Sequence, residues 1–212
     1  MSIKTKEAAL PLRRKPRREQ RDETFEKLLV AARSLFVSRG YKASTLEQIS
    51  AFAGLTKGAV YFHFGAKEAV LLELFRRAEK DVIQPVVVIL LQEELSPAER
   101  LIRFTRVHGE MGVTRREDLL LLILISIEFA GQSGPIGEYV KRLYSILYAP
   151  LEYLISQGQA SGQIRRDVPS TELASVIVSM HDGAFLEWYR RGGELDGRYL
   201  VEAVLSVLLH GL

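Results

Sequence analysis

One segment of this sequence has residue types and spacing suited to binding another molecule. It contains four small or polar residues followed by three hydrogen-bond donors. The small or polar residues are Thr56, Lys57, Gly58 and Ala59, and the donors are Tyr61, His63 and Lys67. A helix that enters the major groove of DNA needs small or polar residues at its leading end, because its backbone must approach the base edges, and it needs donors on its flanks for the phosphates. These seven residues are therefore candidates for DNA contact.

The preceding segment predicts the elements that must position them. Apolar residues recur at three- and four-residue steps and predict a helix that stops near Gly40; they are Phe25, Leu28, Leu29, Ala32, Leu35 and Phe36. Thr45 and Gln48 have the spacing of a capping box, so a second helix should begin there and end at Gly54. Thr56 can cap a short third helix that ends near position 63. Two short helices around a glycine turn predict a helix-turn-helix.

Residues 21–75 resemble the DNA-binding domain of the TetR/AcrR family of bacterial regulators. Three segments carry the resemblance: LF-x(3)-GY over Leu35–Tyr41, the glycine turn SAFAGLTKG over Ser50–Gly58, and YFHFGAKE over Tyr61–Glu68. In that family, residues matching four positions commonly contact phosphates, so the resemblance implies this role for Thr45, Tyr61, His63 and Lys67. Tyr61 could instead close the small core, and His63 could be an ordinary surface histidine.

Two residues depart from the family pattern. Many members have tyrosine where Phe62 stands, so a phenolic donor is absent, and a serine or threonine cap is replaced by Ala66, which should weaken the next helix start by about 1 kcal/mol. Val60 and Phe64 are expected to face away from DNA and to pack on Ile49, Phe36 and Leu71.

The first twenty residues are basic and lack apolar periodicity, which predicts a flexible arm over 1–20. Its cations near the two prolines are Arg13, Arg14, Lys15, Arg17 and Arg18. Such an arm strengthens DNA binding by counterion release. The segment Arg13–Arg18 is a candidate for insertion into the minor groove, and Arg17 and Arg18 are candidates for DNA contact. The alternative is a solubilising tail.

Charge is divided unequally along the chain, although the net charge is only +3. Residues 1–67 hold fourteen Lys and Arg against six Asp and Glu, whereas the remainder holds fifteen against twenty. A basic front joined to an acidic body favours one part that meets a polyanion and another part with a different task.

Composition excludes several kinds of site. The chain has no cysteine, which excludes disulfides and cysteine-ligated zinc and suits a reducing, cytoplasmic setting. The longest apolar stretch, Leu119–Ile125, is shorter than the roughly 18 residues of a membrane helix, and the N-terminus lacks a signal-peptide core. Neither His108-Gly109-Glu110 nor His181-Asp182 has zinc-ligand or triad context. We therefore expect no enzyme activity, no cofactor and no metal.

Helical patterns continue to the C-terminus. A long helix is predicted from Lys67 to about Leu91, kinked or divided at Pro85, and Ser96–Glu99 has the features of another helix start. Further helices are expected over 116–131, 136–160, 170–190 and 197–210. The sequence thus predicts an all-α protein of about nine helices. An N-terminal three-helix helix-turn-helix domain (21–67) should be joined to a larger helical domain (68–212).

In the TetR/AcrR family the later helices form a dimer interface and a ligand cavity, and the resemblance implies both here. Apolar faces over 170–190 and 197–210 could pack with their symmetry mates as a four-helix bundle, with Gly183 and Ala184 allowing close approach. These faces hold Val176, Ile177, Met180 and Ala184 on one helix and Val201, Val204, Leu205, Leu208 and Leu209 on the other. The alternative is that they are internal core.

A small, largely apolar effector would need an apolar cavity with a few polar groups. The candidate ligand-binding residues are Phe104, His108, Met111, Glu128, Phe129 and Tyr148, with Tyr144 and Trp188 as further candidates. Aromatic residues at helical spacing can equally be core.

The combined prediction is a homodimeric, sequence-specific DNA-binding regulator, a repressor released from a palindromic operator by a small-molecule effector. The alternative is a basic-armed helical bundle that acts at a membrane surface or in protein interaction, because a basic arm also attracts anionic lipid.

Overall fold

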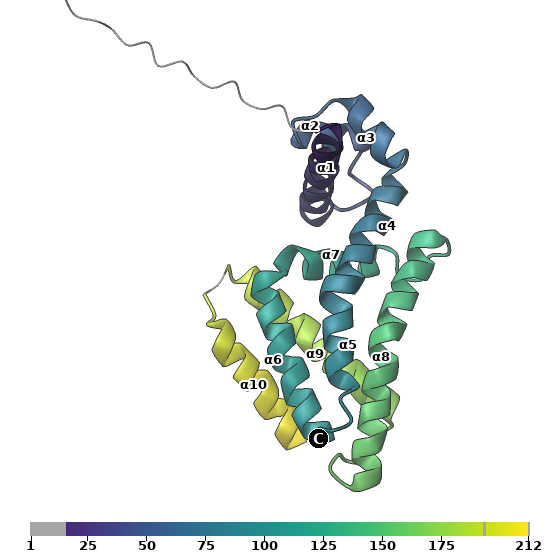
Figure 1. Cartoon of the computed structure of the whole chain (residues 1–212). Helices are drawn as coiled ribbons and strands as arrows, with labels where there is room; N and C mark the ends of the chain where they lie inside the picture. The colour runs from purple at the N-terminus through teal and green to yellow at the C-terminus, as the bar shows by residue number, and fades with distance from the viewer. Residues whose placement is uncertain (1–15, 193, 212) are drawn as a thin grey trace, which may run out of the picture.

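The structure, a computed structural model, describes residues 16–192 and 194–211, and over these residues it contains helices and no strand. The helices are α1 (Arg17–Arg39), α2 (Leu46–Phe52), α3 (Lys57–Phe64), α4 (Lys67–Ala78), the π-helix η1 (Glu79–Ile83), α5 (Gln84–Leu90), α6 (Pro97–Thr114), α7 (Arg116–Glu128), α8 (Pro135–Ser161), α9 (Ser170–Arg190) and α10 (Gly197–Gly211). In Figure 1, α1–α3 form a small unit at the top, and α4 leads from it into a bundle of longer helices. The predicted all-α, two-part architecture is confirmed.

The predicted capping box sets the start of α2. The Thr45 hydroxyl accepts from the Gln48 amide at 3.2 Å, and the Gln48 side chain accepts from the Thr45 amide at 3.0 Å. Gly54 has a φ of +67°, in the left-handed region that glycine adopts without steric cost. This backbone turns the chain into α3, where Val60 is fully buried as predicted.

The start of α1 corrects the predicted arm. The helix begins at Arg17, directly after Pro16, so residues 17–20 form its first turn instead of the end of the arm. This turn lacks apolar residues because it is exposed, and its arginine and glutamate side chains favour helix without burial. Arg13, Arg14 and Lys15 lie outside the described residues.

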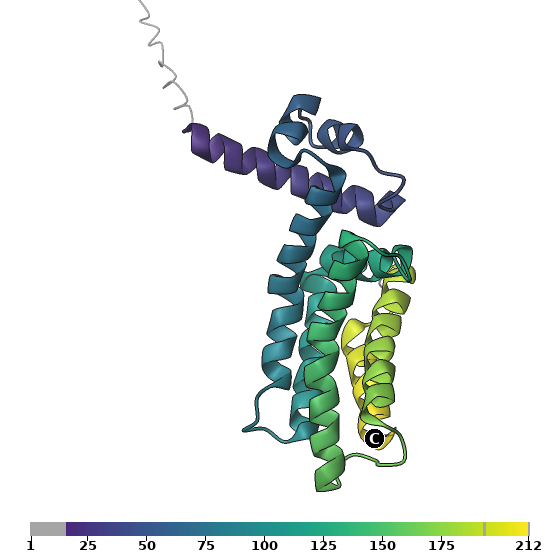
Figure 2. The same cartoon turned by 90° about the vertical axis from the view of Figure 1, so that its right-hand side faces the viewer.

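Pro85 divides the long helix as predicted, and the division is a π-helical turn. The amide of Gln84 donates to the carbonyl of Glu79, five residues earlier, just before the proline that cannot donate. Figure 2 shows that α4, η1 and α5 nevertheless continue as one column. If they are counted as one interrupted helix, the described residues contain nine helices.

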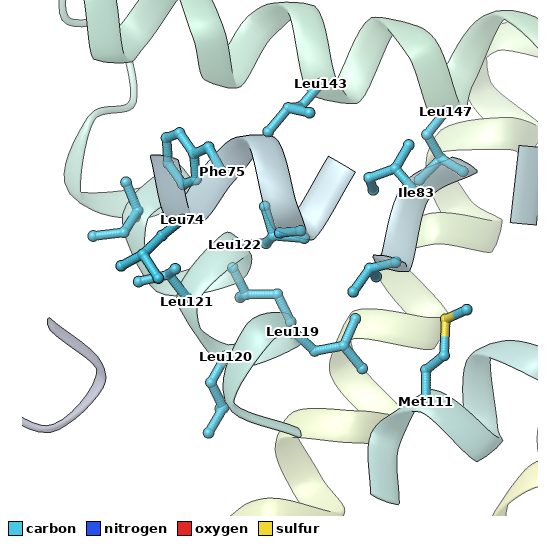
Figure 3. Packing of buried hydrophobic residues seen from close by; sticks show 14 of the residues in the cluster. Leu74, Phe75, Ile83, Met111, Leu119, Leu120, Leu121, Leu122, Leu143 and Leu147 are labelled. Atoms are coloured by element: carbon cyan, nitrogen blue, oxygen red, sulfur yellow. The ribbon is translucent and has the colours of Figure 1, made fainter. Parts of the chain in front are cut away.

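Helix α7 is buried on nearly every side, because it lies between the small N-terminal unit and the bundle. Five successive residues, Leu119–Ile123, are at most 7% exposed, as expected of a helix that is apolar all round. Figure 3 shows Leu143 and Leu147 projecting from α8 toward the helix that carries Phe75 and Ile83, with the leucines of α7 on its other side. The helix ends at Glu128 and not at residue 131. No described helix has the length and apolarity of a membrane span.

Candidate nucleic-acid interface and buried cavities

The first turn of α3 is open to solvent. Thr56, Lys57 and Gly58 are exposed, and Ala59 is half-buried. Thr56 occupies the N-cap position, but its side chain makes no cap hydrogen bond, which corrects the predicted capping role. The hydroxyl is therefore not committed to the helix, and a groove-binding contact remains open to it.

Glu47 of α2 holds two of the predicted DNA-binding side chains. Its Oε1 atom lies 2.7 Å from Lys57 Nζ and accepts from the Tyr61 hydroxyl at 3.1 Å. The hydrogen bond from Lys57 is the main reason that the pKa of Glu47 falls to about 2. Sequence reasoning missed Glu47, because only the placement of α2 beside α3 brings the three groups together.

His63 lies among aromatic rings at the end of α3. Its ring is 5.7 Å from that of Phe25 and 5.3 Å from that of Phe62. Burial, with a smaller repulsion from Arg21, lowers the pKa of His63 below its usual value. A neutral imidazole would give a phosphate a hydrogen bond without a full charge. Phe64 is half-buried and stacks on Phe25 at 4.8 Å between ring centroids, a partner that the sequence did not indicate.

The side chain of Lys67 is already hydrogen-bonded to the backbone. Its ammonium donates to the carbonyls of Tyr41 and Ser44, each at 2.7 Å, and lies 4.2 Å from the centre of the Tyr41 ring. Burial lowers its pKa. Lys67 therefore fixes the loop between α1 and α2, and a phosphate contact would compete with these bonds.

Helix α7 contacts the N-terminal unit near both of its own ends. Near its N-terminal end, Asp118 accepts from Arg33 at 2.7 Å. At its C-terminal end, the two carboxylate oxygens of Glu128 accept from the amides of Tyr41 and Lys42 at 3.0 and 2.8 Å. These contacts fix the N-terminal unit on the bundle.

Two small cavities lie in the bundle and share His108 as a wall, and the outer one is partly open to solvent. The inner cavity measures about 40 Å³ and lies among η1, α5, α6, α7, α8 and α9. The outer cavity measures about 60 Å³ and lies among α6, α9 and α10. Helices α6 and α10 approach closely beside the outer cavity, since a Cβ added at Gly109 would lie 2.3 Å from Val201 Cγ2.

His108 lines both cavities and His181 lines the outer one, and both histidines are neutral. Burial lowers the pKa of His108 to about 3 and lowers that of His181 as well. His181 Nδ1 donates to the carbonyl of Ile177 at 2.7 Å, so its Nε2, 3.0 Å from the Thr105 hydroxyl, is the acceptor.

The inner cavity also contains a carboxyl group and a phenol. Burial raises the pKa of Asp182 to about 6. Burial, with the negative charge of Asp182, raises the pKa of Tyr144 to about 12. The Tyr144 hydroxyl donates to Ser126 Oγ at 3.3 Å.

The structure brings only some of the predicted ligand-binding residues to a cavity. Phe104 and His108 line the inner one. Tyr148 lies beside it, with its ring 6.1 Å from that of Tyr144. Met111 is buried and lines neither cavity.

Glu128 and Phe129 lie at the junction with the N-terminal unit instead of at a cavity. Both carboxylate oxygens of Glu128 are taken by backbone amides, and the Phe129 ring meets the Tyr41 ring at 5.5 Å. Helical periodicity placed Glu128 and Phe129 on the same face as pocket residues, but α7 ends there.

The predicted dimer faces are partly internal. Ile177, Val204, Leu205 and Leu208 are at most 8% exposed within one copy of the chain, so they belong to its own core. The exposed apolar residues of α9 and α10 are Val176, Tyr189, Tyr199, Val207 and Leu209. Gly183 has open space around it, so it is free for close approach by another helix.

Comparison with known proteins covers nearly the whole chain. Residues 28–74 match the family model of "Bacterial regulatory proteins, tetR family", and residues 94–212 match that of "Tetracyclin repressor-like, C-terminal domain". The transcriptional repressor BepR of Brucella suis biovar 1 (strain 1330) is 27% identical over 90% of this chain and 92% of its own length. The transcriptional repressor DhaR of Mycobacterium sp. (strain GP1) is 28% identical over 72% and 75%.

A solved structure agrees with these matches. The MbdR regulator from Azoarcus sp. CIB is 42% identical and superposes with a TM-score of 0.80, over 89% of this chain and 98% of its own. The agreement in sequence and fold extends from the helix-turn-helix through the C-terminal bundle. The chain therefore belongs to the tetR family of bacterial regulatory proteins, and it is a DNA-binding transcriptional regulator.

Proposed function

We propose that this protein is a dimeric repressor that leaves a palindromic operator when a small, largely apolar effector enters the bundle. The observation that carries the proposal is the double attachment of α7. Its residues Leu119, Leu122 and Ile123 line the inner cavity, while Asp118 binds Arg33 of α1 and Glu128 binds the loop that follows α1. An effector that enlarges the cavity would therefore move the helix on which the DNA-binding unit rests.

In the dimer, two copies of α3 would occupy successive major grooves roughly 34 Å apart. Thr56, Lys57, Gly58 and Ala59 would face the bases. Thr45, Tyr61 and His63 would contact phosphates, with Arg17 and Arg18 adding charge from α1, while Lys67 would keep its bonds to the backbone of the loop between α1 and α2. The subunits would pair through α9 and α10, where Val176 and Val207 expose apolar side chains that an interface would cover.

Selection of bound sequences from a random DNA pool tests this function. A palindromic consensus, bound with one dimer per site in analytical ultracentrifugation, is the expected result. Binding should then be repeated with anionic liposomes as competitor. Retention on lipid without preference for any DNA sequence would favour the membrane-surface module and contradict the proposal.

A further inference from the structure

The inner cavity contains one group that can be charged near neutral pH. Its walls are mostly apolar side chains such as Val86, Leu119 and Leu147, and its polar groups are His108, Tyr144 and Asp182. His108 is neutral because burial lowers its pKa to about 3, and Tyr144 is neutral because burial raises its pKa to about 12. Asp182 alone is ionised in an appreciable fraction at neutral pH.

The carboxylate of Asp182 has no compensating partner in the described part of the chain. No hydrogen bond or ion pair joins it to another described residue, and desolvation is the only influence on its pKa. On α8, the negative charge of Asp182 helps to raise the pKa values of Tyr144 and Tyr148, and neither tyrosine gives it a hydrogen bond. Asp182 is half-buried, and a carboxylate at the edge of a mostly apolar cavity without hydrogen bonds or a counter-charge is less well stabilised than one in water, so an occupant that supplies positive charge would be stabilised there.

The remainder of the site suits the body of an organic cation more than a hydrated metal ion. The rings of Phe104 and Tyr144 border the same space, and Tyr148 lies beside Tyr144. Aromatic faces attract substituted ammonium groups, most strongly where water is excluded. The described residues also hold no cluster of three metal-ligating side chains.

We propose that the inner cavity binds an organic cation, a substituted ammonium with an apolar or aromatic body, and that Asp182 supplies its negative counter-charge. This inference rests on the proposed function, since it names the chemical class of the effector for the same cavity. It assigns to Asp182 a binding role that helical patterning did not single out.

The size of the cavity indicates how such a ligand would act. The inner cavity measures about 40 Å³ and the outer one about 60 Å³, whereas sites for drug-sized ligands measure roughly 300–1,000 Å³. The cation therefore has to displace walls, and two are suitably placed: His108, which separates the two cavities, and α7, which contributes Leu119, Leu122 and Ile123.

The proposal can be tested by calorimetry, which compares the affinities of two ligands that have the same shape and differ in charge. Benzyltrimethylammonium and its neutral carbon isostere, neopentylbenzene, should be titrated into wild-type protein, D182N and the control E110Q, in which an exposed carboxylate of α6 is removed. We expect wild type and E110Q to bind the cation about tenfold or more tightly than the isostere. D182N should lose this preference and still bind the isostere, which also shows that the variant is folded.

Equal affinities of wild type for the two probes, no binding of the cation at millimolar concentration, or a preference that survives in D182N would each overturn the proposal. Operator binding without any probe, measured in parallel, separates this failure from failure of the proposed function. A protein that binds its operator and ignores the cation remains a regulator with a different effector. A protein that binds the cation and no operator contradicts the proposed function alone.

Discussion

Glu47 Oε1 and Lys57 Nζ lie 2.7 Å apart on the face that the sequence assigns to DNA. An anionic residue therefore holds a lysine of the recognition helix, and the same oxygen accepts from Tyr61. A phosphate that approaches Lys57 or Tyr61 must displace Glu47 or share the donors with it. Because the pKa of Glu47 is about 2, this charge persists in every ordinary binding buffer.

Replacing Glu47 by glutamine should strengthen DNA binding. The change removes a negative charge from the interface and frees Lys57, so we expect roughly threefold to tenfold higher affinity and a steeper dependence of log Kd on log salt concentration. Fluorescence anisotropy over a salt series measures both. E93Q, at an exposed position between α5 and α6, is the control for net charge. An affinity of E47Q equal to that of E93Q would show that Glu47 does not restrain the interface.

Replacing Lys67 by methionine should destabilise the N-terminal unit. Two backbone carbonyls, of Tyr41 and Ser44, lose a charged donor, and such bonds each contribute about 1.5–3 kcal/mol. Thermal unfolding of K67M should show a lower Tm, and the salt slope of DNA binding should be measured on the same sample. A slope flatter by about 1 at unchanged Tm would instead assign Lys67 to a phosphate.

Replacing Glu128 by alanine should loosen the junction between α7 and α1. The amides of Tyr41 and Lys42 lose their acceptor, so their hydrogen exchange should accelerate by about tenfold or more, equivalent to at least about 1.4 kcal/mol. Exchange followed by mass spectrometry or NMR detects the change. E110A, at an exposed site on α6, should leave both amides protected. Unchanged exchange in E128A would contradict the coupling role of Glu128.

Stability should depend on pH through Asp182. Its pKa is raised from 3.8 to about 6 in the folded protein, so the folded state holds this proton more tightly than the unfolded state does. The contribution of Asp182 to stability is therefore greatest below about pH 4 and is lost as pH rises through about 6.

The D182N variant removes this titration. It should be more stable than wild type at pH 7.5 by up to about 3 kcal/mol, and the difference should vanish below about pH 4. Urea unfolding at several pH values measures it. The lowered pKa of His108 acts in the opposite direction, because its stabilising effect is lost as pH falls below about 6.5, but it is common to both proteins. A difference that is constant across pH would contradict the assignment.

An aspartate on the exposed face of α10 should disrupt the proposed dimer. Val207 is 59% exposed, and so is Val88 of α5, which gives a control matched in residue type and exposure. V207D should sediment as a monomer and lose cooperative operator binding, because burying an unpaired charge at an interface is costly. V88D should remain dimeric. If V207D also remains dimeric, the subunits pair through another surface.

The sequence by itself determined the helical elements and the identity of the DNA-binding unit, because these depend on local rules. The capping residues Thr45 and Ser96, the left-handed turn at Gly54 and the interruption before Pro85 are each specified within a few residues of chain. Local periodicity also placed Val60 correctly in the core.

Only the tertiary structure decided which of the polar side chains are free and which are already bonded. Lys67 contacts residues more than twenty positions earlier, and Glu128 contacts the loop after α1, some 86 positions away. Helical periodicity defines a face but not the helix that covers it, so Ile177 and Val204 are internal where an interface was expected. Asp182 likewise became notable only when it was found to line a mostly apolar cavity together with five other helical segments, none of whose described residues supplies it with a positive charge.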